Sequence, residues 1–215
     1  MKKKPNLEQG NRLLFQGDSI TDMKWGRNQS DRNHYLGHSF VFLIAARLHA
    51  DFESLQLDFF NRGVSGNTTR DLKKRWQNDA IEMKPDILTL LIGTNDVAQN
   101  ILASEFESNY RHIVDASLTS NPKLKLILMN PFVLQSGKLK DETAWKSRRS
   151  STEELCLIVE KIAKDYKATH IELNLIFDRA SEKTGPEHWL WDGVHPLPQG
   201  HEIIARSWIE ALTDE

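Results

Sequence analysis

Five short apolar segments, separated by stretches of helical periodicity, most constrain the fold of this chain. The apolar segments have the length of strands, and the stretches between them repeat apolar side chains with the spacing of amphipathic helices. This alternation predicts a parallel sheet covered by helices on both faces. Right-handed crossovers then favour a flavodoxin-like α/β fold, a three-layer αβα arrangement of five strands in the order 2-1-3-4-5. The expected strands are residues 13–15, 57–60, 87–92, 124–129 and 170–173, and the clearest helical stripes are 40–48, 106–118 and 155–166, with a last helix at about 199–211.

Two Ser-x-x-Glu sequences indicate where helices begin. They start at Ser104 and Ser151 and precede two of the helical stripes. In a capping box of this kind, the two side chains accept hydrogen bonds from each other's free backbone N–H groups. We therefore expect helices to begin at these two serines.

Length and charge limit the classes of protein to which the chain can belong. Its 215 residues suffice for one α/β domain, so we expect a single domain over residues 1–215, with residues 1–10 as a poorly ordered tail. The 28 Lys and Arg residues are balanced by 30 Asp and Glu residues, which leaves no basic field for nucleic acid. Cys156 is the single cysteine, which excludes an intrachain disulfide and a thiolate zinc cluster.

No segment of the sequence is suited to a membrane. The longest apolar run, residues 40–46, is too short to cross a bilayer. The basic residues 2–4 precede a polar segment, residues 5–10, where a signal peptide would have its apolar core. We therefore expect a cytoplasmic protein with no membrane partner.

A Gly-Asp-Ser-Ile-Thr segment, residues 17–21, follows the first expected strand. Ligands of such sheets bind at the carboxyl ends of the strands, where Ser19 can project its hydroxyl into the crevice as a nucleophile. A serine at this place can equally serve as a helix N-cap or a turn residue. No Gly-x-Ser-x-Gly elbow occurs in the chain, which disfavours an α/β-hydrolase of the usual kind.

Polar segments also follow the second and third expected strands. Residues 61–69 contain Gly63 and Gly66, which allow close backbone approach, and the helix that opens after them turns free N–H groups toward the site. The segment is either an oxyanion or phosphate cradle or a tight turn, and no lysine follows Gly66 to form a Walker loop. Residues 93–96 contain Asn95, whose amide can donate to an oxyanion or close an Asx-turn.

The strongest local signal is the Trp-Asp-Gly-Val-His-Pro segment, residues 191–196. Asp192 lies three residues before His195 in a loop bracketed by Pro196 and Pro198, so its carboxylate can fold onto the imidazole Nδ1–H. That hydrogen bond would fix the tautomer and leave Nε2 as a base. The alternative is a solvated loop histidine.

These four segments, in this order, resemble the SGNH (GDSL-type) hydrolase family, which is named for its Ser, Gly, Asn and His blocks. The resemblance implies that Ser19 is the nucleophile, His195 the general base and Asp192 the carboxylate that orients it. It also implies an oxyanion hole made by the backbone N–H groups of Ser19 and Gly66 and the side-chain amide of Asn95. It implies no cofactor and no metal.

The resemblance is closest to the intracellular acetyl-xylan esterases of this family, in residues 17–22, 69–76, 84–86 and 191–196. Those enzymes remove acetyl groups from xylo-oligosaccharides and form ring-like oligomers. The resemblance therefore implies a small-molecule ester substrate, an acetylated oligosaccharide, and a homo-oligomeric protein.

Three residues beside the blocks are candidates for substrate binding. The indoles of Trp25 and Trp191 can stack on a sugar, and Arg62 adjoins the glycine block. The tryptophans can instead pack within the loops or between subunits, and Arg62 can be solvated or ion-paired. Arg148 and Arg149 are expected to form an exposed charged cluster.

Other functions compete with the acetylesterase hypothesis. An esterase, lysophospholipase or thioesterase for a longer acyl chain would use the same residues. A non-catalytic or nucleotide-binding module on a flavodoxin-like sheet is a different class. A metal site could draw on Asp18, Asp22, Asp192 and His195, although the chain has no His-Glu-x-x-His or paired-cysteine spacing.

Overall fold

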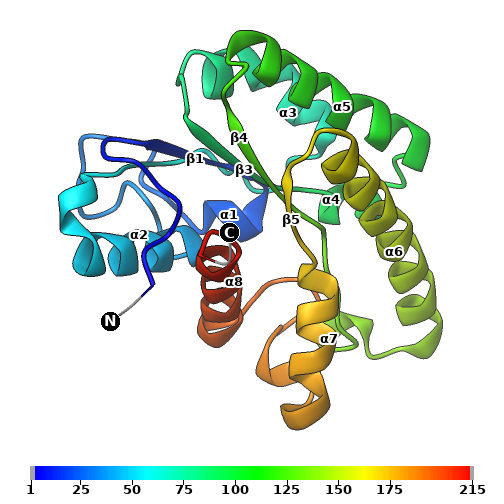
Figure 1. The fold of residues 1–215 in the computed structure, drawn as a ribbon. Helices are drawn as coiled ribbons and strands as arrows, with labels where there is room; N and C mark the ends of the chain where they lie inside the picture. Colours follow the sequence, from blue (N-terminus) through cyan, green and yellow to red (C-terminus); the bar gives the residue numbers. More distant parts are fainter. Residues whose placement is uncertain (1–2, 214–215) are drawn as a thin grey trace.

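A computed structural model describes residues 3–213, in which five parallel strands form one sheet (Figure 1). The strand order is β2-β1-β3-β4-β5, and helices cover both faces, so the predicted flavodoxin-like arrangement is confirmed. β1 lies beside both β2 and β3 and pairs Phe15 with Asn61 and with Thr89. The strands are β1 (Arg12–Gly17), β2 (Asp58–Asn61), β3 (Ile87–Leu91), β4 (Lys125–Met129) and β5 (Thr169–Ile171).

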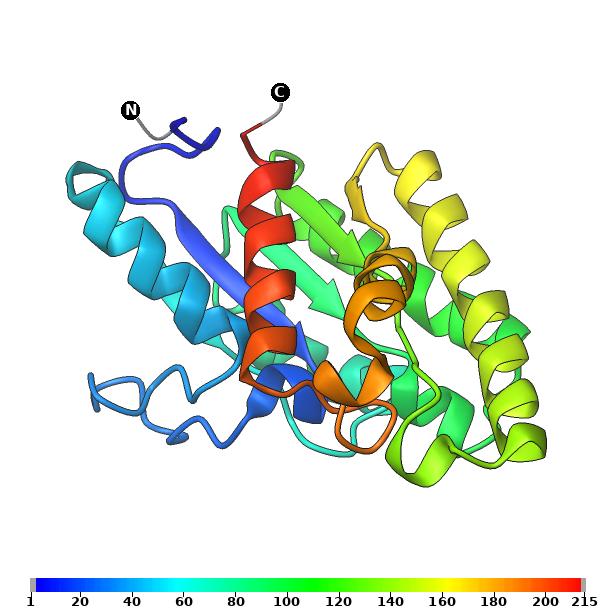
Figure 2. The same ribbon diagram turned by 90° about the horizontal axis from the view of Figure 1, so that it is seen from below.

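The strands are apolar on both sides because each face of the sheet carries its own core. Leu13 and Phe15 of β1 point into one core, and Leu14 points into the other. The first core lies under α2 (Phe40–Asp51), α7 (Leu173–Thr184) and α8 (Pro198–Ala211). The second lies under α3 (Thr69–Trp76), α5 (Ala103–Ser120) and α6 (Glu142–Asp165). Figures 1 and 2 show these two sets of helices on opposite sides of the strands.

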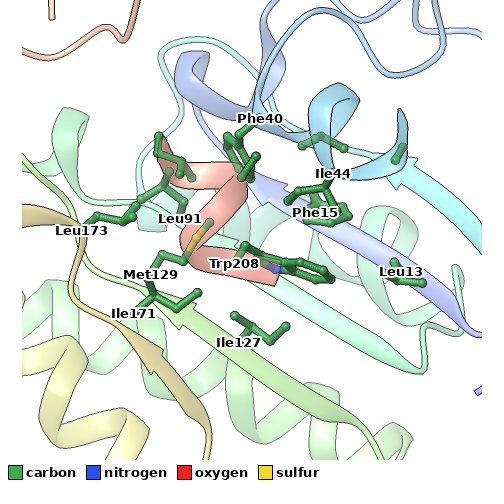
Figure 3. Close-up of a cluster of buried hydrophobic side chains, with 14 of the residues drawn as sticks. Leu13, Phe15, Phe40, Ile44, Leu91, Ile127, Met129, Ile171, Leu173 and Trp208 are labelled. Atoms are coloured by element: carbon green, nitrogen blue, oxygen red, sulfur yellow. The ribbon is translucent and has the colours of Figure 1, made fainter. Parts of the chain in front are cut away.

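Trp208 of α8 anchors the first core. Its side chain is fully buried and lies 5.5 Å from the ring of Phe15, centroid to centroid (Figure 3). The indole Nε1–H donates to Thr89 Oγ1 of β3 at 2.9 Å, which satisfies the one polar atom of the ring. The last helix is therefore fixed to the centre of the sheet.

The remaining elements are short. They include α1 (Ser19–Asp22) and α4 (Thr94–Ala98), which begin just after β1 and β3. A π-helix, η2 (Gln77–Ile81), continues α3. The 3-10 turns are η1 (Glu53–Leu55), η3 (Gly137–Leu139) and η4 (Pro186–His188).

The two predicted capping boxes are wrong. Helix α5 begins one residue before Ser104, and its N-cap, Leu102, has no side-chain cap. Helix α6 begins at Glu142, where the Asp141 side chain accepts from Ala144 N, so Ser151 lies inside the helix. A capping box does form at α3, where Thr68 N and Oγ1 both donate to the Asp71 carboxylate.

Part of the predicted N-terminal tail is packed. Leu7 is buried in the first core, and Asn6 N donates to Leu212 O beyond α8. Residues 1 and 2 of that tail lie outside the described residues. Over residues 3–213, the helices are too short or too polar for any of them to traverse a bilayer.

Candidate active site

Ser19 lies where the chain leaves β1. Asp18 forms the N-cap of α1, and its Oδ1 accepts from Ile20 N at 3.0 Å, which fixes the first turn of the helix. Ser19 is half-buried, and its Oγ lies 2.8 Å from His195 Nε2. Two residues 176 positions apart in the chain are thus within hydrogen-bond distance, as required of a nucleophile and its base.

Asp192 lies behind the imidazole of His195. Its Oδ2 is 2.8 Å from His195 Nδ1, and its Oδ1 accepts from the backbone N–H groups of Val194 and His195. With Nδ1 as the donor to this carboxylate, Nε2 is left free to accept the proton of Ser19. The arrangement can activate the hydroxyl and stabilise an imidazolium.

The loop that carries Asp192 and His195 is held by its own bridge and by contacts with residues 134–139. Leu190 and Pro196 form an antiparallel bridge at its base, and Ser136 Oγ donates to Leu190 O at 2.6 Å. Leu134 N donates to Gly193 O at 3.0 Å. Gly193 has φ +99°, and a Cβ there would lie 2.7 Å from a side-chain carbon of Leu139. No local sequence pattern indicates these supports, because they come from a segment about 55 residues earlier in the chain.

The two acidic residues of the site have different environments. Burial tends to raise the pKa of Asp192, but hydrogen bonds from the backbone and imidazole of His195 outweigh it and hold this pKa below its ordinary value. Asp18 is 1% exposed, and burial raises its pKa to about 7 against the lowering effect of Ile20 N–H and of His195. Asp192 is therefore the carboxylate that stays ionised beside the imidazole.

The glycine and asparagine segments meet at the same edge of the sheet. Gly66 has φ +85°, and a Cβ added there would meet no atom within 4 Å, so its backbone borders open space. Asn95 lies in the first turn of α4, and its Nδ2 donates to Asn67 O at 3.0 Å. The second proton of that amide remains to be donated to a ligand.

Arg75 of α3 holds Asn67, the residue that follows Gly66. Its Nε donates to Asn67 Oδ1 at 2.8 Å, and its Nη1 lies 3.1 Å from Asp79 Oδ2. Asn67 thereby joins Arg75 on α3 to Asn95 on α4. The sequence has no signal for this contact beyond the position of Arg75 in the 69–76 motif.

The three candidates for substrate binding lie in different environments. Trp191 is 59% exposed, and its ring centroid is 6.4 Å from that of His195. Trp25 is only 5% exposed, and its Nε1 donates to Gly63 O, so it offers no open face and the stacking hypothesis for it is wrong. The guanidinium of Arg62 lies over the Trp25 ring at 5.1 Å and its Nη2 contacts Met83 Sδ, so it packs against protein rather than standing free for a substrate.

Arg148 and Arg149 do not form the expected exposed cluster. Arg148 Nη2 donates to Thr94 O at 2.6 Å. Arg149 is bidentate to Asp178, at 2.8 and 2.6 Å. Each guanidinium thus has a partner that lies far away in the sequence, and Arg149 also pairs with Glu153, four residues later.

The acidic residues of the metal alternative do not converge. Asp192 faces His195, Asp22 faces Arg27 and Ser65, and Asp18 faces Ile20 N. Within residues 3–213, no cluster of three or more His, Cys, Asp or Glu side chains is arranged to hold a metal ion.

Comparison with known proteins gives consistent matches over nearly the whole chain. Residues 15–203 match the GDSL-like lipase/acylhydrolase family. The acetylxylan esterase of Geobacillus stearothermophilus is 32% identical over an alignment of 215 residues that covers 94% of each chain. The crystal structure of Axe2, an acetylxylan esterase from that organism, has a TM-score of 0.83 and 31% identity over 98% of this chain and 97% of its own. LAE5, an alpha/beta hydrolase enzyme from the metagenome of Lake Arreo, has a TM-score of 0.85 and 28% identity over 97% and 98% of the two chains.

Proposed function

Because the chain belongs to the GDSL-like lipase/acylhydrolase family and is a carboxylic ester hydrolase, we propose that it removes acetyl groups from carbohydrate esters such as acetylated xylo-oligosaccharides. In this proposal Ser19 is the nucleophile, His195 the general base and Asp192 the orienting carboxylate. The observation that carries it is the 2.8 Å distance between Ser19 Oγ and His195 Nε2, with Asp192 Oδ2 2.8 Å from the opposite ring nitrogen.

The first half of the reaction forms an acetyl-enzyme. Ser19 Oγ attacks the carbonyl carbon of the ester while His195 Nε2 takes the hydroxyl proton. The negative oxygen of the tetrahedral intermediate is bound by the backbone N–H groups of Ser19 and Gly66 and by Asn95 Nδ2–H. When the intermediate collapses, the bond to the sugar oxygen breaks and His195 returns the proton to that oxygen.

The second half releases acetate. Water attacks the acetyl carbonyl of Ser19 while His195 Nε2 takes a proton from the water, and collapse of the second intermediate returns that proton to Ser19 Oγ. Asp192 stays ionised throughout and stabilises the imidazolium, in keeping with its lowered pKa. These three side chains need no cofactor for either half.

Two observations support an acetylated carbohydrate as the substrate. One is the similarity to acetylxylan esterase over 94% of the chain. The other is the exposed indole of Trp191 beside the His195 ring, since an aromatic face next to a reactive centre suits the apolar face of a sugar.

Specificity for a short acyl group is tested with p-nitrophenyl esters from acetate to octanoate. We expect kcat/KM to be highest for acetate and to fall with chain length, because the proposed substrate carries only a methyl group on its acyl side and each added methylene changes the binding free energy by about 1–3 kcal/mol. A rate that is flat or rises toward octanoate would favour the long-chain esterase. In parallel, acetate release is measured from acetylated xylo-oligosaccharides and from glucose pentaacetate, with phospholipid as the competing substrate.

Asn95→Ala tests the oxyanion hole. Removal of one such donor typically lowers kcat by about 10²–10³-fold, and we expect a loss of this size because Nδ2 has one proton left for the oxyanion. The midpoint of thermal unfolding should change little, since the side chain makes one hydrogen bond to Asn67 O and is only half-buried. Full activity of the folded variant would remove Asn95 from the hole.

A further inference from the structure

The carboxylate of Asp22 is joined to the residue just before Gly66. Asp22 is the last residue of α1 and is 2% exposed. Its Oδ2 accepts from Ser65 N at 2.9 Å and from Ser65 Oγ at 2.8 Å. The same oxygen lies 2.6 Å from Arg27 Nη2, so one carboxylate oxygen receives three donors. Hydrogen bonds to a charged acceptor are the stronger kind, so Ser65 is firmly held.

The segment that follows Asp22 also holds the other end of the glycine loop. Gly63 O accepts from Trp25 Nε1 and from Arg27 Nη1, both at 2.9 Å. The Arg27 guanidinium lies over the Trp25 ring at 4.7 Å, and Arg27 itself has φ +53°. One side chain, Arg27, thus joins the Asp22 carboxylate to the Gly63 carbonyl.

The two segments are also in direct backbone contact. A Cβ on Gly63 would lie 2.4 Å from Asp22 N and 2.9 Å from Asp22 Cα, which no side chain could tolerate. Their separation is therefore set by van der Waals contact as well as by hydrogen bonds. Little room is left for residues 63–65 to move relative to α1, which begins at Ser19.

Gly66 needs this support because of its own conformational freedom. Its φ of +85° is open to glycine without strain, but glycine also visits many other conformations at similar free energy. A donor in an oxyanion hole is effective only when it is oriented before the reaction begins. The orientation of the Gly66 N–H must therefore come from its neighbours.

We propose that Asp22 is a positioning residue for catalysis: through Ser65 it fixes the Gly66 N–H toward the oxyanion, and Arg27 holds the Asp22 carboxylate in place. The inference rests on the proposed function, since it requires that Gly66 N–H bind the oxyanion. If it holds, the residues on which the rate depends include a buried aspartate, Asp22, and its exposed partner Arg27, neither of which touches the substrate.

The test uses Asp22→Asn and Ser65→Ala, singly and together. For p-nitrophenyl acetate we expect Asp22→Asn to lower kcat by about 10–100-fold with KM nearly unchanged. The reason is that displacement of a catalytic donor by about 1 Å can lower the rate by up to about 10²-fold. Ser65→Ala removes only the Oγ contact and should lower kcat by roughly 3–10-fold. The double variant should match Asp22→Asn, because both changes act through one contact.

A second readout separates positioning from a merely structural role. Methylboronic acid forms a tetrahedral adduct with a nucleophilic serine and mimics the intermediate, so its dissociation constant should rise by the same factor as kcat falls. The matched control is Asp165→Asn, which removes an aspartate from an Arg111 pair of 2.7 Å between α5 and α6. We expect normal kcat and normal boronate affinity for this control.

Two results would overturn the inference. One is unchanged kcat and boronate affinity in folded Asp22→Asn. The other is unchanged kcat and unchanged boronate affinity in Ser65→Ala. This variant is used if Asp22→Asn does not fold, because the Ser65 side chain is exposed and its replacement should leave the fold intact. Either result, combined with normal labelling of Ser19 by a fluorophosphonate in the parent protein, rejects the role of Asp22 alone. Absence of labelling in the parent protein rejects the proposed function itself.

Discussion

Replacement of Ser19 by alanine is expected to lower kcat for p-nitrophenyl acetate by on the order of 10⁴–10⁶-fold, since loss of a serine nucleophile removes the covalent route entirely. The Oγ that lies 2.8 Å from His195 Nε2 is the atom that would attack the ester. Initial rates and labelling with a fluorophosphonate probe measure the effect, and the label should disappear in the variant.

Ser207→Ala is a matched control for this variant. Ser207 also lies in a helix, α8, where its Oγ donates to Ile203 O at 2.9 Å, and it should keep both activity and label. Alanine suits either helix, so neither variant should lose its fold. Labelling or substantial turnover by pure Ser19→Ala would assign the nucleophile to another residue, and a parent protein that takes up no label would favour a binding module.

Asp192→Asn is expected to lower kcat by about 10³–10⁴-fold with the fold preserved, because the tautomer of His195 would be wrong. The backbone N–H groups of Val194 and His195 both donate to Oδ1, which keeps the asparagine oxygen on that side. The asparagine NH₂ would then face Nδ1, which would have to accept. The ring proton would move to Nε2, where it would block removal of the Ser19 proton.

Asp31→Asn offers a control with the same spacing. Asp31 Oδ2 lies 2.9 Å from His34 Nδ1, also three residues apart, on the exposed loop between α1 and α2. Rates for p-nitrophenyl acetate should be unchanged by this substitution. Equal losses in the two variants, or none in Asp192→Asn, would contradict the role assigned to Asp192.

The architecture could be predicted from the sequence because its signals are local. The apolar runs at Leu13 and at Ile87 belong to strands with two covered faces, and the stripe from Phe40 to Leu48 coincides with α2. Proximity at the carboxyl ends of the strands followed from parallel topology alone, which brought Ser19 and Asn95 to one edge. The predicted homo-oligomer and cytoplasmic location stay predictions.

The parts that could not be predicted are contacts between segments distant in the chain. The sequence leaves open whether Trp25 stacks on a sugar or packs within its loop, because nothing near it shows that Gly63 O accepts its Nε1–H. The helix assigned to Ser151 began nine residues earlier, at Glu142, since Asp141 supplies the cap instead. The contact of Asp22 with Ser65 spans 43 residues and has no periodic or motif signal.

The short hairpin closed by Leu190 and Pro196 has a consequence for how the reaction can be controlled. It carries the imidazole and its carboxylate together, so a rigid shift of this hairpin would leave their mutual geometry intact. Only the gap to Ser19 Oγ would widen, and about 1 Å is enough to slow such a step markedly. For proton transfer from the serine, competence thus depends on one distance, between the residue that follows the first strand and a loop near the carboxyl terminus.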